Sequence, residues 1–296
     1  SVYTKVSALL AENHVCVKTE SLVEGKDKEY VNTGANICSF DVTIVKHEHE
    51  WKLDSQYPHL HSCACGKSEN HEYDSSTGKC KICQSECSHK GVDNDGTCFT
   101  CKAQMLVKIE NGGKTTYGTD FKSAMKNATN GTKITLLADV SIPNRTGISG
   151  DDTTVTLDLN GHKITSGWLD VGGKDTNGTY TTCTLKIIGK GSYEPPMYGG
   201  IITVDLKATL DLSEWEGGTI SSINISDSSN YEAATREAAV IVGPKAGTIG
   251  KLAFGNNQLP KITKTKLSGG SFNEIWAADF GPVKLGDLLA DGYAYQ

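Results

Sequence analysis

The stretch Val155-Thr156-Leu157-Asp158-Leu159-Asn160-Gly161 alternates apolar and polar side chains and ends on an Asn-Gly turn. Alternation with a period of two is typical of a β-strand that buries one face, and Asn-Gly is a strong turn signal. Similar strands are expected at Ile134/Leu136, Cys183/Leu185/Ile187, Ile202/Val204/Leu206, Ile220 to Ile225, Val240-Ile241-Val242, Ile249 to Phe254 and Ile262 to Leu267. No helical pattern separates these strands, so an alternating β–α architecture is excluded.

Two all-β architectures accommodate such strands, a β-sandwich and a parallel β-helix in which each coil stacks on the next. Residues 119–128 favour the β-helix, because they predict an amphipathic helix that would cover the open edge of the first coil. Thr119 or Asp120 supplies its N-cap. Its apolar face consists of Phe121, Ala124, Met125 and Ala128. We therefore predict that residues 104–296 form an all-β domain, a right-handed single-stranded parallel β-helix with a short N-terminal capping helix.

The preceding residues 47–103 carry a duplicated pattern of histidine and cysteine. In each copy a His is followed nine positions later by a Cys-x-x-Cys pair, with a Gly two positions before the first Cys. The copies are His71, Gly78, Cys80, Cys83 and His89, Gly96, Cys98, Cys101. A Cys-x-x-Cys turn places two thiolates about one tetrahedral edge apart, as zinc requires. The segment is poor in aliphatic residues, so we expect it to be small, irregular and stabilised by the metal.

Zinc is favoured over disulfides in this cluster because six of the eight histidines lie near its cysteines, and disulfides make no use of histidine. One complete Cys₃His set consists of Cys87, His89, Cys98 and Cys101. The other predicted set consists of Cys65, His71, Cys80 and Cys83, with Cys63 as the nearest substitute for Cys65. His49, His61 and Cys63 then remain, either for a third metal site or as side chains of an exposed linker. Each set fills four positions and H-E-x-x-H is absent, so we expect two structural zinc ions, with a third as the open alternative.

The remaining cysteines carry weaker signals. Cys183 alternates with apolar residues and is expected to be a core thiol. Cys16 and Cys38 lie in residues 1–46, which resemble the tail of a preceding β module, and either form a disulfide or are buried thiols. The chain begins Ser1-Val2-Tyr3 without Met, which suggests a segment of a longer protein.

The net charge and the absence of several motifs argue against some classes of function. The net charge of −6 and the mixed distribution of Lys and acids argue against a nucleic-acid partner. No apolar run is long enough for a transmembrane helix, so no direct membrane insertion is expected in this segment. Nucleophile-elbow and phosphate-loop motifs are absent, and outward acids such as Asp158 and Asp170 are as typical of solvated strands as of catalytic pairs. We therefore predict that this chain is not an enzyme.

Aromatic residues in or beside turns are the candidate binding residues. Residues 190–200 form a stiff, partly apolar loop in which Tyr193, Met197 and Tyr198 are expected to contact a partner. Trp215 and Trp276 belong to the same group of aromatics. The alternative is that such rings pack over the corners of the coils.

The sequence also resembles a known group. Residues 131–140 (GTKITLLADV) and 155–164 (VTLDLNGHKI) resemble the first coils of β-helix domains in large surface proteins of Gram-positive bacteria, especially gut Firmicutes. Residues 267–275 (LSGGSFNEI) and 288–295 (LLADGYAY) resemble their closing segment. Residues 47–51 and the duplicated Cys/His units resemble the zinc-binding linkers of the same proteins. One departure is that the usual Cys-x-x-Cys before the first His is shortened here to Cys63-x-Cys65.

The resemblance covers about residues 47–296 and implies a secreted or cell-surface bacterial module. The group includes adhesins and immunoglobulin-binding B-cell superantigens. It therefore implies a host-protein partner, most concretely immunoglobulin variable domains. Two alternatives stay open. One is a carbohydrate-active β-helix, similar to a polysaccharide lyase or glycosidase, or a glycan-binding accessory domain; the other is a stalk without a ligand.

Overall fold

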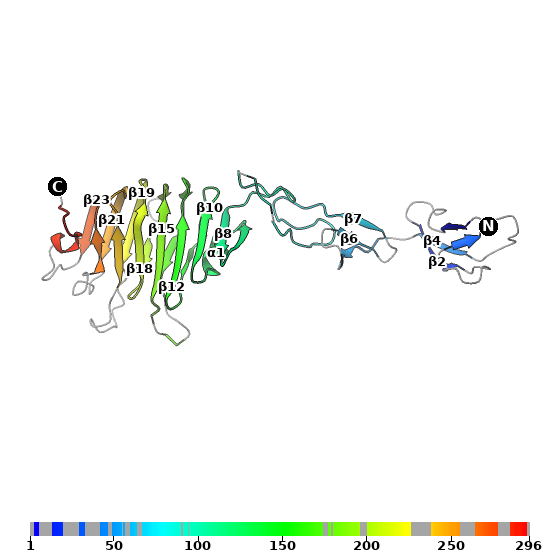
Figure 1. The fold of residues 1–296 in the computed structure, drawn as a ribbon, viewed down its shortest axis with the longest axis horizontal. Coiled ribbons are helices and arrows are strands. Elements are labelled where there is room, and N and C mark those ends of the chain that lie inside the picture. The colour runs from blue at the N-terminus through cyan, green and yellow to red at the C-terminus, as the bar shows by residue number, and fades with distance from the viewer. Residues whose placement is uncertain are drawn as a thin grey trace. The chain divides into compact units, whose positions relative to one another are not determined.

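The structure of the chain is a computed structural model (Figure 1). It describes residues 3–5, 14–19, 30–32, 42–46, 49–54, 56, 60–63, 67–89, 91–93, 95–173, 177–178, 180–195, 200–225, 238–254, 264–277 and 285–294. Up to residue 46 the description covers the backbone alone. Internal contacts divide the chain into two compact units, Ser1–Cys87 and Ser88–Gln296, which are described separately. The boundaries expected at 46/47 and 103/104 stay predictions.

The second unit contains two long β-sheets. The first sheet has the order β22-β20-β18-β15-β12-β10-β8-β9. Its strands are β8 Val107–Asn111, β9 Lys114–Gly118, β10 Thr132–Leu136, β12 Thr153–Asp158, β15 Cys183–Gly189, β18 Thr209–Trp215, β20 Ala239–Val242 and β22 Lys266–Leu267. From β10 to β22 every neighbouring pair is parallel, so each coil adds one strand beside the strand of the coil before it.

The second sheet is built in the same way. It has the order β11-β14-β17-β19-β16-β13, and β21 pairs with both β19 and β23. Its strands are β11 Arg145–Ile148, β13 Lys163–Ile164, β14 Trp168–Val171, β16 Ser192–Tyr193, β17 Ile202–Val204, β19 Thr219–Ile225, β21 Thr248–Phe254 and β23 Ser271–Ala277. Its pairs are all parallel in the described part of the chain. The predicted all-β parallel β-helix, here called the β-solenoid, is therefore confirmed.

Inward side chains stack in register from coil to coil. Val155 lies opposite Leu185, which lies opposite Leu210, which in turn lies opposite Val240. All four are 0% exposed. Burying a Val or Leu side chain completely contributes about 1.5–3 kcal/mol, so such columns hold the coils together. Cys183 is buried in the same core, as its alternation predicts.

Helix α1 and a hairpin lie at the first coil. Helix α1, Phe121–Lys126, packs against β11 and β8 and buries Phe121 and Met125. Asp120 is its N-cap and accepts hydrogen bonds from the backbone N–H of Lys122 and from the Ser123 hydroxyl. On the first sheet, the antiparallel hairpin β8–β9 pairs with β10. The capping helix was predicted over a longer range, 119–128, and the hairpin was not predicted.

The closing segment pairs with the last strand of the first sheet. The 3₁₀ helix η4, Leu285–Leu288, buries Leu288 in the core. The next residue, Leu289, forms a parallel bridge with Leu267 of β22. In the described part of the chain, residues 285–289 therefore close this end of the first sheet.

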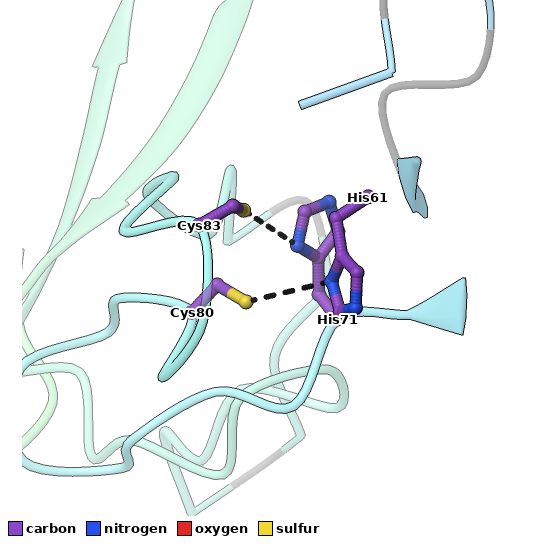
Figure 2. A group of neighbouring side chains, drawn as sticks. All are labelled: His61, His71, Cys80 and Cys83. Atoms are coloured by element: carbon purple, nitrogen blue, oxygen red, sulfur yellow. Dashed lines mark hydrogen bonds between the residues drawn. The ribbon is translucent and has the colours of Figure 1, made fainter. Parts of the chain in front are cut away.

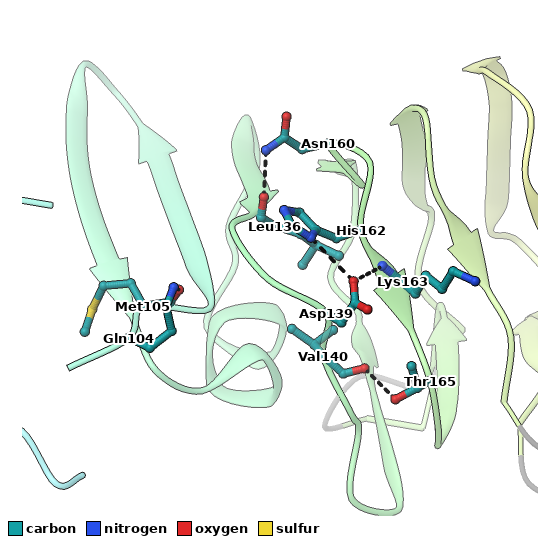
Figure 3. Close-up of polar contacts among 9 residues, drawn as sticks. All are labelled: Gln104, Met105, Leu136, Asp139, Val140, Asn160, His162, Lys163 and Thr165. Carbon is teal, nitrogen blue, oxygen red and sulfur yellow. Dashed lines mark hydrogen bonds and ion pairs between the residues drawn. The ribbon is translucent and has the colours of Figure 1, made fainter. Parts of the chain in front are cut away.

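Turns between strands are also tied to the neighbouring coil (Figure 3). The Asn160 side-chain amide donates to the Leu136 carbonyl at 3.0 Å. The Thr165 hydroxyl donates in the same way to the Val140 carbonyl at 3.2 Å. The partners lie 24 and 25 positions apart, which is about one coil. Because buried carbonyls require hydrogen-bond partners, these bonds make the turns part of the stack.

The first unit consists of small antiparallel sheets. Strand β1 (Tyr3–Lys5) pairs with β3 (Tyr30–Asn32), and β2 (His14–Thr19) pairs with β4 (Val42–Lys46). Strands β5 (Lys52–Leu53), β6 (Leu60–Ser62) and β7 (Ser68–Asn70) form a third sheet. The side chains of Cys16 and Cys38 lie outside the description, so their pairing stays open. In the described part of the chain, no helix is both long enough and apolar enough to span a membrane.

Candidate metal centres

The duplicated sequence pattern folds into two copies of one turn. The backbone N–H of Cys80 donates to the Ser85 carbonyl at 2.8 Å, and that of Cys98 donates to the Ala103 carbonyl at 2.9 Å. Gln84 and Lys102, which follow the second Cys of each pair, both have a φ of 60°. Matching residues lie 18 positions apart, as Cys80 and Cys98 do. The two copies therefore share a backbone conformation as well as a sequence pattern.

The first group of metal-ligand side chains consists of His61, His71, Cys80 and Cys83. One donor atom from each residue lies within 4.8 Å of all the others. His61 Nδ1 lies 3.9 Å from Cys80 Sγ, and His71 Nδ1 lies 3.3 Å from Cys83 Sγ; both contacts are drawn in Figure 2. Tetrahedral zinc with bonds of about 2.0–2.3 Å separates its ligand atoms by about 3.3–3.8 Å. The first group therefore needs little rearrangement to hold such an ion.

The second group consists of Cys87, His89, Cys98 and Cys101, the four residues predicted as a set from the sequence. Their donor atoms also lie within 4.8 Å of one another, with His89 Nδ1 at 3.4 Å from Cys101 Sγ. All three cysteines of this group are buried. The two groups thus differ in composition, because the first offers two thiols and the second offers three.

The first thiol of each Cys-x-x-Cys pair has a lowered pKa. Burial raises the pKa of the Cys80 thiol, but hydrogen bonds from the backbone N–H groups of Cys83 and Ile82 and from the His71 ring outweigh burial and lower that pKa to about 6. The equivalent groups of the second copy lower the pKa of Cys98 to about 6 as well. Because the thiolate is the form that binds a metal, both residues are ready to act as ligands at neutral pH.

The donor sets fit a structural metal ion. In the described residues, the Nε2 atoms of His61 and His71 are buried without a hydrogen-bond partner, while their Nδ1 atoms face the thiols. Four sulfur and nitrogen donors in a closed group are the composition of structural zinc sites. A catalytic zinc would keep one position for water, whereas each group here supplies all four donors.

Among the described side chains, His61 takes the fourth place in the first group. Cys65, the predicted fourth ligand, lies outside the described residues. From the sequence, His61 is a candidate for a third site with His49 and Cys63, the alternative being an exposed linker, but neither of those two belongs to a metal-ligand group in the described part of the chain. His49 packs its ring 4.8 Å from the ring of Trp51. Spacing alone does not reveal His61 because it lies on strand β6, outside the duplicated unit.

The structure corrects the expectation for two aromatic residues. Tyr193, predicted to contact a partner, is 1% exposed, and its hydroxyl donates to the Gly167 carbonyl. Trp215 is fully buried, and its indole N–H donates to the Gly191 carbonyl at 3.0 Å. Both rings fill the interior of the β-solenoid because burying a large ring with a satisfied polar atom is favourable. The other two predicted contacts, Met197 and Tyr198, lie outside the described residues.

Outward acids of the β-solenoid pair with cations of the adjacent coil. Arg145 donates two hydrogen bonds to Asp170, at 2.9 and 2.6 Å. Lys133 Nζ lies 3.0 Å from Asp158 Oδ2. Exposed pairs of this kind contribute about 0–1 kcal/mol each to the stability of the fold, so they add little to the stability of the β-solenoid.

Comparison with protein-family models, with curated proteins and with solved structures finds no match for this chain.

Cys183 is expected to resist alkylation under conditions in which the metal-ligand thiols react. Burial raises the pKa of the Cys183 thiol to about 11. Only about one thiol in a thousand is then ionised at pH 8, and the thiolate is the reactive form. After chelation at pH 8, iodoacetamide should modify Cys80 and Cys98 within minutes and leave Cys183 intact until denaturant is added. Peptide mass spectrometry measures this order, and early modification of Cys183 would contradict it.

Proposed function

We propose that the chain is a non-enzymatic, extracellular binding module of a bacterial surface protein. Two structural zinc ions fold its Cys/His-rich segment, and the β-solenoid presents the surface that binds a host protein. The observation that carries this proposal is that each metal-ligand group already contains four sulfur and nitrogen donors within 4.8 Å of one another. Such a set stabilises a fold and offers no coordination position to a substrate.

Zinc is favoured over other metals by the donor chemistry. Mixed thiolate and imidazole donors in a tetrahedral group suit zinc, whereas calcium and magnesium require oxygen ligands. The first group with its two thiolates leaves a zinc site neutral, and the second with three thiolates leaves it with one negative charge. Both arrangements are ordinary for structural zinc.

The outer face of the second sheet is a better candidate for the binding surface than the segment around Tyr193, which is buried. Trp276 of β23 is 41% exposed, and Lys251 of β21 lies over its ring at 5.3 Å from the ring centre. Trp168 lies on β14, and the guanidinium of Arg145, on β11 of the adjacent coil, lies 5.0 Å from the centre of its ring. Trp and Arg dominate the energetics of protein interfaces because they bury large areas and offer polar atoms. This face therefore replaces Tyr193 as the proposed contact.

The partner class follows from the resemblance of the coils and linkers to bacterial surface proteins. A host protein, and most concretely an immunoglobulin variable domain, is the proposed ligand. A β-solenoid by itself is equally compatible with glycan binding, so the partner must be tested directly.

Immobilised full chain is expected to bind purified polyclonal immunoglobulin saturably in biolayer interferometry. Trp276→Ser should weaken this binding at least about tenfold, because an exposed Trp is a typical hot-spot residue. Tyr293→Ser is the matched control: Tyr293 is 46% exposed, but it follows the closing segment and belongs to no strand of the second sheet. The same chain is probed on a glycan array. Glycan retention without immunoglobulin binding would contradict the proposal and support a carbohydrate-binding module.

A further inference from the structure

The two Cys/His copies differ at one ligand position. In the second copy the fourth ligand, Cys87, lies two positions before His89. The equivalent position of the first copy, two before His71, is occupied by Glu69. The first group takes its fourth donor from His61 instead. A carboxylate therefore stands where the duplicated turn would otherwise provide a third thiol.

Glu69 and His61 are direct neighbours across a strand pair. In the antiparallel register of β6 and β7, His61 lies opposite Glu69. Directly opposed residues point to the same face of a sheet, with Cβ atoms about 4.5–5.5 Å apart. Glu69 Oε2 lies 3.8 Å from His61 Nε2. The carboxylate thus reaches the side of the ring that is turned away from the thiols.

The ring of His61 has one polar atom that needs a partner. His61 is 0% exposed, and its Nδ1 faces Cys80 Sγ. Its Nε2 is buried and has no hydrogen-bond partner among the described residues. When Nδ1 of a histidine binds a metal, Nε2 carries the proton and donates it, most often to a carboxylate or a carbonyl. A shift of roughly 0.6–1 Å in the exposed Glu69 side chain would complete that hydrogen bond.

We propose that Glu69 is a positioning residue of the first metal site, whose carboxylate accepts the Nε2–H of His61 and directs Nδ1 to the metal. The pair of Glu69 and His61 then takes the place of the third thiolate. Two thiolates and one carboxylate carry the same total charge as the three thiolates of the second site. This inference rests on the proposed metal binding and adds a residue outside both ligand sets.

The first test measures the metal affinity of each site in the full chain. With ¹¹³Cd in place of zinc, the sites give separate resonances because their numbers of sulfur ligands differ. Glu69→Gln should weaken the first site about 10–100-fold in a chelator titration and leave the second unchanged. The control is Glu72→Gln, an exposed glutamate that pairs with Lys81 rather than with a ligand. Equal affinities in wild type and Glu69→Gln would overturn the inference.

Two further measurements separate positioning from a merely structural role. Long-range ¹H–¹⁵N spectra should show His61 with its proton on Nε2 in the metal-bound wild type, and Glu69→Gln should shift that resonance. His61→Ala should lose the first-site cadmium resonance, and Glu69→Cys added to it should restore a resonance with three sulfur ligands. Retention of the first resonance in His61→Ala, or no recovery in the double variant, would contradict the assignment. A wild type without bound metal would instead refute the proposed function itself.

Discussion

Cys98→Ser is expected to reduce the bound metal from two ions per chain to one and to unfold the second Cys/His copy, while the β-solenoid stays folded. Cys98 is 0% exposed and is a donor of the second group. Structural zinc contributes about 10–16 kcal/mol of apparent binding free energy in small zinc domains, which a segment with few aliphatic residues cannot replace. The loss of one ligand should therefore be enough to unfold this copy.

The unfolding should stop at the first strand of the β-solenoid. Met105 is fully buried, and its backbone N–H donates to the Gly96 carbonyl at 2.7 Å, so it belongs to the turn that loses its metal. The hydrophobic core of the β-solenoid begins at Val107 and is continuous to Leu288. Because this core needs no metal, its backbone amides should stay protected.

Metal analysis by mass spectrometry gives the number of ions, and hydrogen exchange gives the extent of unfolding. Fast exchange is expected in residues 88–105, and slow exchange is expected in β12 and β15. Cys183→Ser is the control, since Cys183 is also buried but belongs to neither group. This variant should bind both ions, and its free energy of unfolding should be lower by about 1–3 kcal/mol because it buries a hydroxyl. Two ions in Cys98→Ser, or lost protection in β12, would contradict the expectation.

The parts of the fold that follow from local chemistry were predictable from the sequence. Alternation around Leu157 reveals which side chains point inward, and together with the amphipathic residues 119–128 it leads to the stacked coils. The Cys-x-x-Cys spacing similarly indicates the thiols of both metal-ligand groups, because the two residues bind within one turn. In each case a few neighbouring residues carry the whole signal.

The parts that depend on distant pairing were not predictable. The role of His61 arises from its position opposite Glu69 in an antiparallel sheet, and spacing within the duplicated unit contains no trace of that register. Tyr193 lies in a segment that reads as a loop, yet its ring points inward because β16 pairs with β13 and β19 in the stack. The β8–β9 hairpin, in contrast, carries a local signal that the prediction missed, because Val107-Lys108-Ile109-Glu110 alternates and is followed by Asn111-Gly112.

Gly218→Ala is expected to destabilise the β-solenoid far more than Gly161→Ala, although both glycines have nearly the same backbone conformation. Their φ angles are +87° and +85°, so alanine costs about 1–2 kcal/mol at either position through strain alone. At Gly161 an added Cβ meets nothing within 4 Å. At Gly218 it would lie 2.1 Å from the Gly191 carbonyl oxygen, which no flexible side chain can relieve.

The displaced carbonyl has a structural role of its own. The Gly191 oxygen accepts the hydrogen bond from the indole of Trp215, a fully buried ring. Moving this oxygen leaves a buried N–H without its partner, which adds about 1–3 kcal/mol to the strain. For a domain of this size each kcal/mol lowers Tm by about 2–4 °C. Gly161→Ala should thus lower Tm by only a few degrees and Gly218→Ala by about 10 °C, measured by calorimetry on the metal-loaded chain. Similar Tm values for the two variants would show that the coils yield at this contact and that close packing between them does not limit stability.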